Sequence, residues 1–449
     1  MVGLGKTGMS LVTFLLNQGA EVSVSDTREL PALQKALSSF LEKGYSLELE
    51  GGGHSLPFFQ KAEMVLVSPG IALDLPALRA VEAQGIPVWG ELEIFSLYDQ
   101  TPVVAVTGTN GKTTATALLN EMLVSSGKNT YLGGNIGRPL MDYILQGEKR
   151  EIVVAEISSF QLDTTRRFRP QVGLLLNITE DHLDRYPDFQ AYVDSKASLF
   201  RNQGMDTPAV INWDDPLCRS IGERLPGPVY FFSRMNRVDR GGYLDGPKAA
   251  LRLSAGTEIY PLEGFSLPGV HNLENALAAI VGARLSGATP EGIQKALETF
   301  KGFGHRLQYV GEIRGIRFYD DSKATNVGAV VKALEGFQQP VILIAGGRDK
   351  GGNYGPLQTL IKAKVRHLIL LGEAREIMRK QLSPHADTIT VDSLDEAVLT
   401  AFEKGRPGDA VLLSPACSSF DMFRDYAQRG DLFQEAVRRL ADQNGGTGS

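Results

Sequence analysis

The stretch Thr107-Gly108-Thr109-Asn110-Gly111-Lys112-Thr113-Thr114 decides the fold of this chain. It follows an apolar, β-branched run at 102–106 and opens into a helical pattern at 115–124. A strand, a glycine-rich turn and a helix N-terminus direct backbone N–H groups and the helix dipole toward one point, which suits a phosphate group. The Lys112 ammonium can then lie between the β- and γ-phosphates of ATP, and the Thr113 hydroxyl can bind Mg²⁺. The sequence therefore predicts a strand–loop–helix ATP site.

The loop is shorter than the usual P-loop. Only Thr109 and Asn110 separate Gly108 from Gly-Lys, where the common motif has four residues. A generic phosphate loop or a chance match is the alternative interpretation. The flanking strand and helix patterns favour the ATP site.

The composition of the 449 residues is that of a folded chain of about three domains. The net charge of −6 does not favour binding to nucleic acid or to a membrane surface. No apolar run reaches transmembrane length, and no signal-peptide pattern opens the chain. We expect a cytoplasmic, monomeric protein that binds small molecules. Cys218 and Cys417, the only cysteines, are expected to be reduced thiols.

Short apolar runs alternate with longer helical patterns, which favours α/β units built on parallel sheets. Polar breaks at 98–102 and 301–304 predict three domains, at residues 1–97, 98–302 and 303–449. Gly-rich, alternating segments at 227–267 predict a small β insert in the middle domain. The expected strands are 21–25, 64–68, 87–89, 102–106, 152–155, 172–177, 209–212, 341–345, 367–371, 388–391 and 410–413.

Three further residues of the middle domain are candidates for the ATP and metal chemistry. Glu156 directly follows an apolar run, so its carboxylate is expected at the edge of the sheet where ligands bind, in a position to hold Mg²⁺. His182 stands among carboxylates after another strand and is a candidate metal or phosphate ligand. An ammonium at Lys196 would be repelled by Mg²⁺, so a lysine there must be neutralised or modified. An exposed strand-end glutamate, a surface histidine and a solvated helix lysine are the alternatives.

Polar side chains farther along the chain complete the expected nucleotide site. Asn272 and Asn275 are three residues apart, on one face of a helix, where two amides can recognise an adenine edge. Capping of the helix start by Asn272 is the alternative and is compatible with that role. Arg306 can stabilise charge on a transferring γ-phosphate from an adjacent domain, unless it is an ordinary surface arginine.

Seven motifs spread over nearly the whole chain resemble those of the Mur ligase family, in its D-glutamate-adding branch. They lie at 108–114, 133–137, 156–162, 181–186, 271–275, 320–328 and 414–423. Together these motifs are highly specific, whereas any one alone is not. The Asp-Asn-Pro-Arg and Asp-Asp-Pro-Arg motifs of the diamino-acid-adding branch do not occur in the sequence. The resemblance implies an α/β protein with an N-terminal Rossmann-like domain that binds UDP, a central ATPase domain and a C-terminal Rossmann-like domain that binds the amino acid.

The resemblance also implies a role for individual residues. Lys112, His182, Lys196 and Arg306 would be catalytic, with Lys196 carbamylated and two Mg²⁺ sites formed by Thr113, Glu156, His182 and Lys196. ATP would be bound by Gly108, Thr109, Asn110, Gly111, Lys112, Thr113, Thr114, Asn272, Asn275, Arg306, Asp321 and Lys323. The UDP substrate would be bound by Thr7, Asp26, Thr27, Arg28, Ser68, Pro69, Gly70, Asn135, Ser159 and Gln161. D-glutamate would be bound by Thr325, Lys350, Ser419 and Phe420.

The N-terminal segment supports a different function. Gly3-Leu4-Gly5-Lys6-Thr7-Gly8 followed by Asp26 matches a dinucleotide fingerprint, so a nicotinamide-dependent dehydrogenase is an alternative. It does not explain the ATP loop. Only Met1 and Val2 precede Gly3, so either the natural chain begins earlier or the first strand of this domain is short.

The expected reaction is ATP-driven amide-bond formation. The terminal carboxylate of UDP-N-acetylmuramoyl-L-alanine would attack the γ-phosphate of ATP to give an acyl phosphate, which the amine of D-glutamate would then attack. A folylpolyglutamate-synthase-like ligase is the near alternative. A dehydrogenase or a non-catalytic nucleotide sensor is the distant one.

Overall fold

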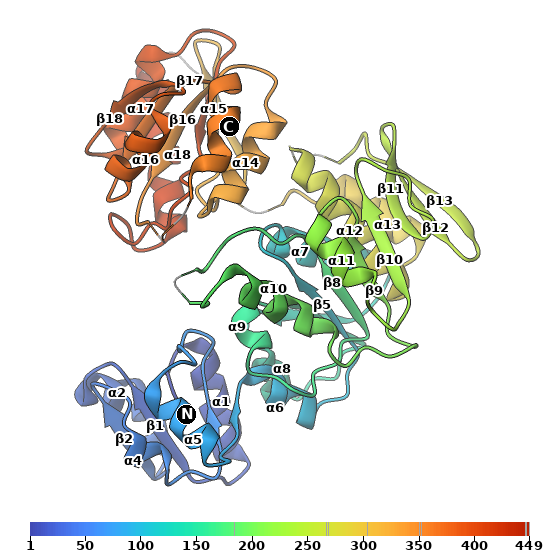
Figure 1. Ribbon diagram of the computed structural model, residues 1–449, viewed down its shortest axis with the longest axis vertical. Helices are drawn as coiled ribbons and strands as arrows, with labels where there is room; N and C mark the ends of the chain where they lie inside the picture. The colour runs from blue at the N-terminus through green and yellow to red at the C-terminus, as the bar shows by residue number, and fades with distance from the viewer. Residues whose placement is uncertain are drawn as a thin grey trace.

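The computed structural model of the chain has three lobes in a row (Figure 1). It describes residues 1–183, 185–265, 267, 269–302, 304–349, 351, 353–444 and 447–448. Lys350, one of the residues expected to bind D-glutamate, lies outside them. The predicted class is confirmed, because each lobe combines helices with a mainly parallel sheet.

The middle lobe is built on a nine-stranded sheet in the order β13-β12-β11-β10-β9-β8-β5-β7-β6. All neighbours pair in parallel from β6 to β11, and β12 and β13 add antiparallel strands at one edge. The predicted β insert is therefore an extension of the central sheet. Its strands are β5 (Val103–Thr107), β6 (Thr130–Gly134), β7 (Ile152–Glu156), β8 (Val172–Leu175), β9 (Ala209–Asn212), β10 (Val229–Ser233), β11 (Gly241–Asp245), β12 (Lys248–Leu253) and β13 (Gly256–Pro261).

Strand β5 is buried on both faces, which explains its unbroken apolar sequence. Val104 and Val106 belong to the core beneath α7 (Lys112–Ser125), α12 (Val270–Leu285) and α13 (Pro290–Thr299). Val103 and Ala105 belong to the core of the opposite face, beside α8 (Leu140–Gln146) and α10 (Phe189–Ala197). Because β5, β7 and β8 are parallel neighbours, their carboxyl ends share one edge of the sheet. The remaining elements of this lobe are α9 (Ser159–Leu162), η1 (Ser198–Phe200) and α11 (Pro216–Gly222).

The C-terminal lobe has a seven-stranded sheet in the order β18-β17-β16-β19-β15-β14-β20. Its central strand β16 (Val341–Gly346) alternates between two cores, with Leu343 in one and Ile342 and Ile344 in the other. The other strands are β14 (Gln308–Ile313), β15 (Ile316–Asp320), β17 (Val365–Leu371), β18 (Asp387–Thr390), β19 (Ala410–Leu413) and β20 (Thr447–Gly448). The helices are α14 (Val327–Gly336), η2 (Gly355–Leu357), α15 (Gln358–Lys364), α16 (Arg375–Leu382), α17 (Leu394–Lys404) and α18 (Tyr426–Asn444).

The N-terminal lobe contains two short parallel pairs, β1-β2 and β3-β4. Val2 lies between them and bridges to Ser25 on one side and Val67 on the other, so a very short first segment joins the two pairs. The Met1 amine is buried and donates to the Ser23 carbonyl at 2.6 Å, and burial lowers its pKa to about 5. The elements are α1 (Lys6–Asn17), β1 (Val22–Asp26), α2 (Leu30–Ala36), α3 (Ser38–Glu42), β2 (Leu47–Gly51), α4 (Leu56–Phe59), β3 (Val65–Leu66), α5 (Pro76–Ala83), β4 (Val88–Trp89) and α6 (Glu91–Tyr98).

Each predicted strand is present within one or two residues of its expected place, although β3 and β4 are only two residues long. The sequence did not predict strands β2, β6, β14, β15 and the two-residue β20. β2 alternates leucine with glutamate and is only partly buried, and β6 ends in two glycines, so neither gives a clear apolar run. β14 and β15 form an antiparallel hairpin at the edge of the C-terminal sheet.

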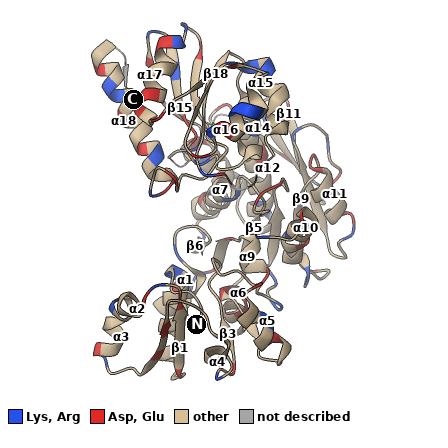
Figure 2. Cartoon of the chain, turned by 60° about the vertical axis from the view of Figure 1, so that its left-hand side comes forward, with Lys and Arg blue, Asp and Glu red and all other residues tan. Residues whose placement is uncertain are grey.

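Charged residues of both signs occur in all three lobes (Figure 2). Within the part of the chain that the structure describes, no helix combines the length and apolarity needed to cross a bilayer.

Helix α6 joins the N-terminal and middle lobes and carries a buried carboxyl group at its start. Glu91 Oε1 accepts a hydrogen bond from the Met141 N–H at 2.9 Å, and its Oε2 accepts one from Gln161 Nε2 at 3.4 Å. The side chain is surrounded by protein, and burial raises its pKa to about 7 from an ordinary value of 4.5. We therefore expect the stability of this junction to depend on pH.

We expect Glu91→Gln to flatten the pH dependence of stability. Between the ordinary pKa of 4.5 and the folded pKa of about 7, the folded protein keeps a proton that the unfolded chain has lost, so stability falls as pH rises through this window. The contribution is on the order of 3 kcal/mol. Urea unfolding across this pH range measures it, with the exposed Glu63→Gln as control. An unchanged slope in Glu91→Gln would contradict the buried, protonated carboxyl.

Candidate active site

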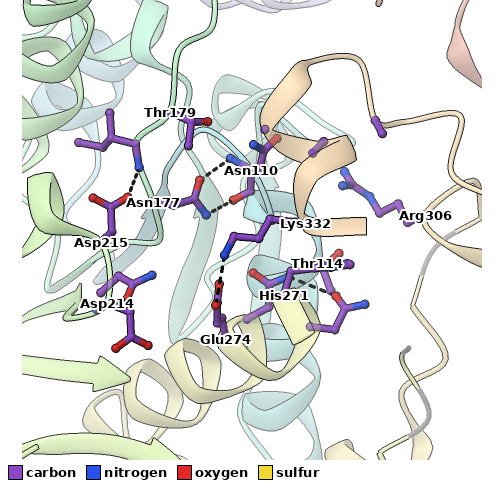
Figure 3. Close-up of a pocket in the computed structure, with 18 of the residues that line it drawn as sticks. Asn110, Thr114, Asn177, Thr179, Asp214, Asp215, His271, Glu274, Arg306 and Lys332 are labelled. Atoms are coloured by element: carbon purple, nitrogen blue, oxygen red, sulfur yellow. Dashed lines mark hydrogen bonds and ion pairs between the residues drawn. The ribbon is translucent and has the colours of Figure 1, made fainter. Parts of the chain in front are cut away.

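The phosphate loop lies between β5 and α7, as the sequence predicts. Gly111 is the N-cap of α7 and has a left-handed φ of +81°, which glycine adopts without strain. Asn177, at the end of β8, fixes the loop: its Oδ1 accepts the Asn110 N–H at 2.8 Å, and its Nδ2 donates to the Asn110 carbonyl at 3.0 Å (Figure 3). The loop backbone is therefore held in place by the neighbouring strand.

Two lysines converge on one carbonyl oxygen of this loop. Lys112 Nζ donates to the Gly108 oxygen at 2.9 Å, and Lys196 Nζ, from α10, donates to the same oxygen at 2.8 Å. Lys196 is only 1% exposed and lies over the Tyr192 ring, 4.5 Å from its centroid. Burial and then the Lys112 charge hold the Lys196 pKa well below its ordinary value, and burial also lowers the Lys112 pKa. The arrangement favours Lys196 as a neutral amine.

Glu156 lies at the end of β7 and is buried. Its Oε1 accepts a hydrogen bond from Asn135 Nδ2 at 2.6 Å, whereas its Oε2 has no hydrogen-bond partner among the described residues. A buried carboxylate oxygen that accepts no hydrogen bond from the described residues is suited to bind a cation. The described residues contain no group of three His, Cys, Asp or Glu side chains arranged to hold a metal, so any Mg²⁺ here would take further ligands from phosphate and water.

His182 occupies a strained position in the loop after β8. Its φ is +56°, which is uncommon for a residue other than glycine. Its backbone N–H donates to Asp181 Oδ1 at 2.9 Å, and its Nε2 lies 3.7 Å from Asp181 Oδ2. The ring packs edge-on against Phe160 with centroids 4.9 Å apart. A backbone held off its preferred conformation is typical of functional loops.

A cavity of about 510 Å³ opens beside the phosphate loop, between the middle and C-terminal lobes (Figure 3). Residues from both sides of the interface line it. Among those predicted for ATP binding, the lining contains Asn110, Gly111, Thr114, Asn272, Asn275, Arg306, Asp321 and Lys323.

The asparagine pair lies directly against the phosphate loop. Asn275 Nδ2 donates to Asn272 Oδ1 at 3.2 Å, and a Cβ added at Gly111 would come within 2.2 Å of Asn275 Oδ1. Helix α12 begins at Val270 with Gly269 as its N-cap, so the alternative that Asn272 caps this helix is wrong.

The C-terminal lobe contributes three predicted side chains to this cavity. Arg306 is half-buried, and burial lowers its pKa, partly offset by Glu156 and Asp321. Burial raises the pKa of Asp321 to about 7, and its carboxylate accepts the Leu307 N–H and the Ser414 hydroxyl. Lys323 Nζ lies 3.7 Å from the centroid of the Tyr426 ring.

A second cavity, of about 310 Å³, lies between the His182 loop and the start of α14. Thr325 lines it, together with Asp349 and Gly351 on either side of Lys350. Ser419 is buried at 2% exposure and Phe420 is 61% exposed, and neither lines this cavity. Of the three described residues predicted for D-glutamate, Thr325 alone lines this cavity.

The residues predicted for the UDP substrate divide between two lobes. Thr7, Asp26, Thr27, Arg28, Ser68, Pro69 and Gly70 lie in the N-terminal lobe, and Asn135, Ser159 and Gln161 lie in the middle lobe. Asp26 accepts hydrogen bonds from the Leu4 N–H and from Arg28, which hold its pKa far below the ordinary value. Gln161 forms a capping box with Ser158.

Three models of Mur ligase domains match the chain: the MurD-like N-terminal domain at residues 1–90, the middle domain at 106–283 and the glutamate ligase domain at 305–417. Two curated relatives are the UDP-N-acetylmuramoylalanine–D-glutamate ligases of Geotalea daltonii and Trichlorobacter lovleyi. The first is 43% identical over 98% of this chain and 97% of its own length, and the second is 45% identical over 98% of both. The chain belongs to the Mur ligase family.

Solved structures share the fold at low sequence identity. A pseudomurein peptide ligase type C from Methanothermus fervidus has a TM-score of 0.64 at 20% identity, over 98% of this chain and 99% of its own. The UDP-N-acetylmuramate–alanine ligase of Thermotoga maritima has a TM-score of 0.59 at 19% identity, over 98% of both chains. The three-lobed arrangement of this Mur ligase is therefore shared with these structures.

Several contacts of this Mur ligase involve residues that sequence reasoning did not select for the site. Asn177 could have been selected, because it ends a strand next to the one that carries the phosphate loop. Arg185 could not. Its guanidinium donates to the Gly70 and Ile71 carbonyls at 3.0 and 2.8 Å and stacks on Phe160, joining the middle lobe to the predicted UDP loop.

We expect Gly111→Ala to lower ATP affinity by about tenfold or more, because its Cβ would strain the left-handed backbone of the loop. That atom would also displace Asn275. Gly127→Ala is the matched control, since Gly127 has a φ of +80° but nothing within 4 Å of an added Cβ. Calorimetric titration with ATP measures the difference. Equal affinity in the two variants would show that the Gly111–Asn275 contact is not needed.

Proposed function

We propose that this chain is an ATP-dependent, ADP-forming ligase that adds D-glutamate to UDP-N-acetylmuramoyl-L-alanine in peptidoglycan precursor synthesis. Its curated relatives carry that activity in their name. The observation that carries the proposal is the convergence of Lys112 and Lys196 on the phosphate loop. Asn110 and Gly111 of the same loop line a cavity to which the C-terminal lobe contributes Arg306.

The first step would be attack of the substrate carboxylate on the γ-phosphate of ATP. The carboxylate oxygen bonds to phosphorus, the bond to the β-phosphate oxygen breaks, and ADP leaves with its electron pair. Two anions approach each other in this step, so the site must offset their repulsion. The Lys112 ammonium, the N–H groups at the start of α7 and the Arg306 guanidinium would do so.

Thr113 and Glu156 would hold one Mg²⁺, and His182 with a carbamylated Lys196 would hold a second. Mg²⁺ in such sites neutralises phosphate charge. The unpartnered Glu156 Oε2 supports the first site. The depressed Lys196 pKa supports the second, because only a neutral amine attacks CO₂ to form a carbamate.

The second step would be attack of the D-glutamate amine on the acyl phosphate, giving a tetrahedral intermediate that collapses to amide and phosphate. Thr325 lines the cavity next to the His182 loop, which suits the incoming amino acid. We propose that Lys350, Ser419 and Phe420 also contribute to the amino-acid site. In this attack the amine gives up a proton to a base.

The UDP part of the substrate would bind the N-terminal lobe at Thr7, 26–28 and 68–70, with Asn135, Ser159 and Gln161 completing the site from the middle lobe. We further propose a cytoplasmic, monomeric enzyme whose partners are its small-molecule substrates. No observation favours the folylpolyglutamate-type or dehydrogenase alternatives over this one.

Phosphate release distinguishes these functions. We expect release that needs ATP, D-glutamate and UDP-N-acetylmuramoyl-L-alanine together. Release with folate and L-glutamate instead, or nicotinamide reduction without ATP, would overturn the proposal.

We expect Lys112→Ala to lower kcat by about 10²–10³-fold, because the charge that offsets the γ-phosphate is lost. The fold should persist, since the hydrogen bonds of Lys112 Nζ within the described part of the chain go to carbonyls of its own loop. Coupled ADP assay and circular dichroism test the two statements. Lys128→Ala, a surface lysine paired with Glu151, is the control. Near-normal turnover of Lys112→Ala would remove it from the mechanism.

We expect Lys196→Ala to be nearly inactive and to recover part of its activity with added formate or acetate, which can supply the missing carboxylate. In the unaltered enzyme, labelled bicarbonate should give a carbamate carbon signal by NMR that Lys196→Ala lacks. Full activity of Lys196→Ala, or of the enzyme rigorously freed of CO₂, would show that the carbamate is not required.

A further inference from the structure

The start of helix α14 in the C-terminal lobe touches the phosphate loop of the middle lobe through one side chain. Asn326 is the N-cap of this helix, and its Oδ1 accepts the Ala329 N–H at 2.9 Å. Its Nδ2 donates across the lobe boundary to Asn110 Oδ1 at 3.1 Å and to Asp181 Oδ2 at 3.0 Å. The Asn326 oxygen caps its own helix and also accepts a hydrogen bond from Asn110 Nδ2 at 3.4 Å, and the Asn326 nitrogen donates to two loops of the other lobe.

Both partners of Asn326 belong to the proposed chemistry. Asn110 lies in the phosphate loop, and Asn177 holds its backbone N–H and carbonyl. Asn326 holds the side chain of Asn110. Asp181 also accepts the His182 N–H, so its carboxylate connects Asn326 to His182. The Asn326 amide therefore holds the C-terminal lobe in contact with both loops.

The close approach depends on a glycine in the first turn of α14. A Cβ added at Gly328 would lie 2.8 Å from Thr179 Oγ1 and 3.3 Å from Asn110 Nδ2. Thr179 belongs to the loop that leads to His182. Any side chain at Gly328 would push the helix away from the loops that Asn326 reaches.

We infer that Asn326 is a positioning residue that aligns the C-terminal lobe with the phosphate loop and the His182 loop, so that nucleotide and incoming amino acid meet in one geometry. This inference rests on the proposed function for its kinetic consequence, but the alignment of the lobes can be measured without turnover.

The test separates the two roles of Asn326, which are to cap helix α14 and to hydrogen-bond to the middle lobe. Asn326→Ser keeps a good N-cap but is too short to reach Asn110 and Asp181. Gly328→Ala keeps Asn326 and raises helix propensity, yet blocks the approach. Ser393→Ala is the matched control, because Ser393 caps α17 in the same lobe and lines neither cavity.

We expect kcat to fall about tenfold or more in Asn326→Ser and Gly328→Ala, the size expected for losing a bridging hydrogen bond to a charged group. The KM for the UDP substrate, which binds the distant N-terminal lobe, should change less than kcat. Ser393→Ala should keep normal kcat and lose only thermal stability.

Small-angle X-ray scattering of the full chain with Mg²⁺ and a non-hydrolysable imido analogue of ATP gives the second readout. We expect a larger radius of gyration in Asn326→Ser and Gly328→Ala than in the unaltered protein and Ser393→Ala. Equal radii and equal kcat would overturn the inference. If the unaltered protein shows no D-glutamate-dependent phosphate release, the proposed function fails while the scattering still decides the role of Asn326.

Discussion

Two lysine side chains donate hydrogen bonds to the carbonyl oxygen of Gly108, and the site is organised around this oxygen. Lys112 reaches it from the helix that follows the loop, and Lys196 reaches it from a helix much later in the chain. Burying two amines so close together disfavours a charge on both. A site of this kind is stable when one amine is neutral or modified, or when anions enter it. The ATP phosphates and a carbamate would supply both conditions.

The central sheet makes this convergence possible. Strands β5, β7 and β8 run in parallel, so the phosphate loop, Glu156 and Asn177 emerge at one edge. Two apolar cores, one on each face, hold this edge rigid. Rigid placement matters, because charge stabilisation in phosphoryl transfer depends on groups already in position.

The site is shared between lobes, which couples chemistry to lobe position. Arg306 and Asp321 line the cavity beside the phosphate loop from the C-terminal side, and Asn326 bonds directly to loops of the middle lobe. Arg185 makes the corresponding contact with the N-terminal lobe through the carbonyls of Gly70 and Ile71. Each lobe is thus held to the middle one by polar contacts, which can form and break at modest cost in free energy.

The α/β class, the phosphate loop, the strand end that carries Glu156 and the loop that carries His182 could all be predicted from the sequence. These follow from local patterns, since an apolar run that ends in a polar or glycine-rich turn specifies both a buried strand and an exposed ligand edge. Only the tertiary structure decided that Lys196 shares an oxygen with Lys112, that Asn275 packs on Gly111 and that Asn326 bridges two lobes. These contacts join residues 88 to 216 positions apart, and their geometry depends on how the elements and lobes pack, which no local pattern encodes.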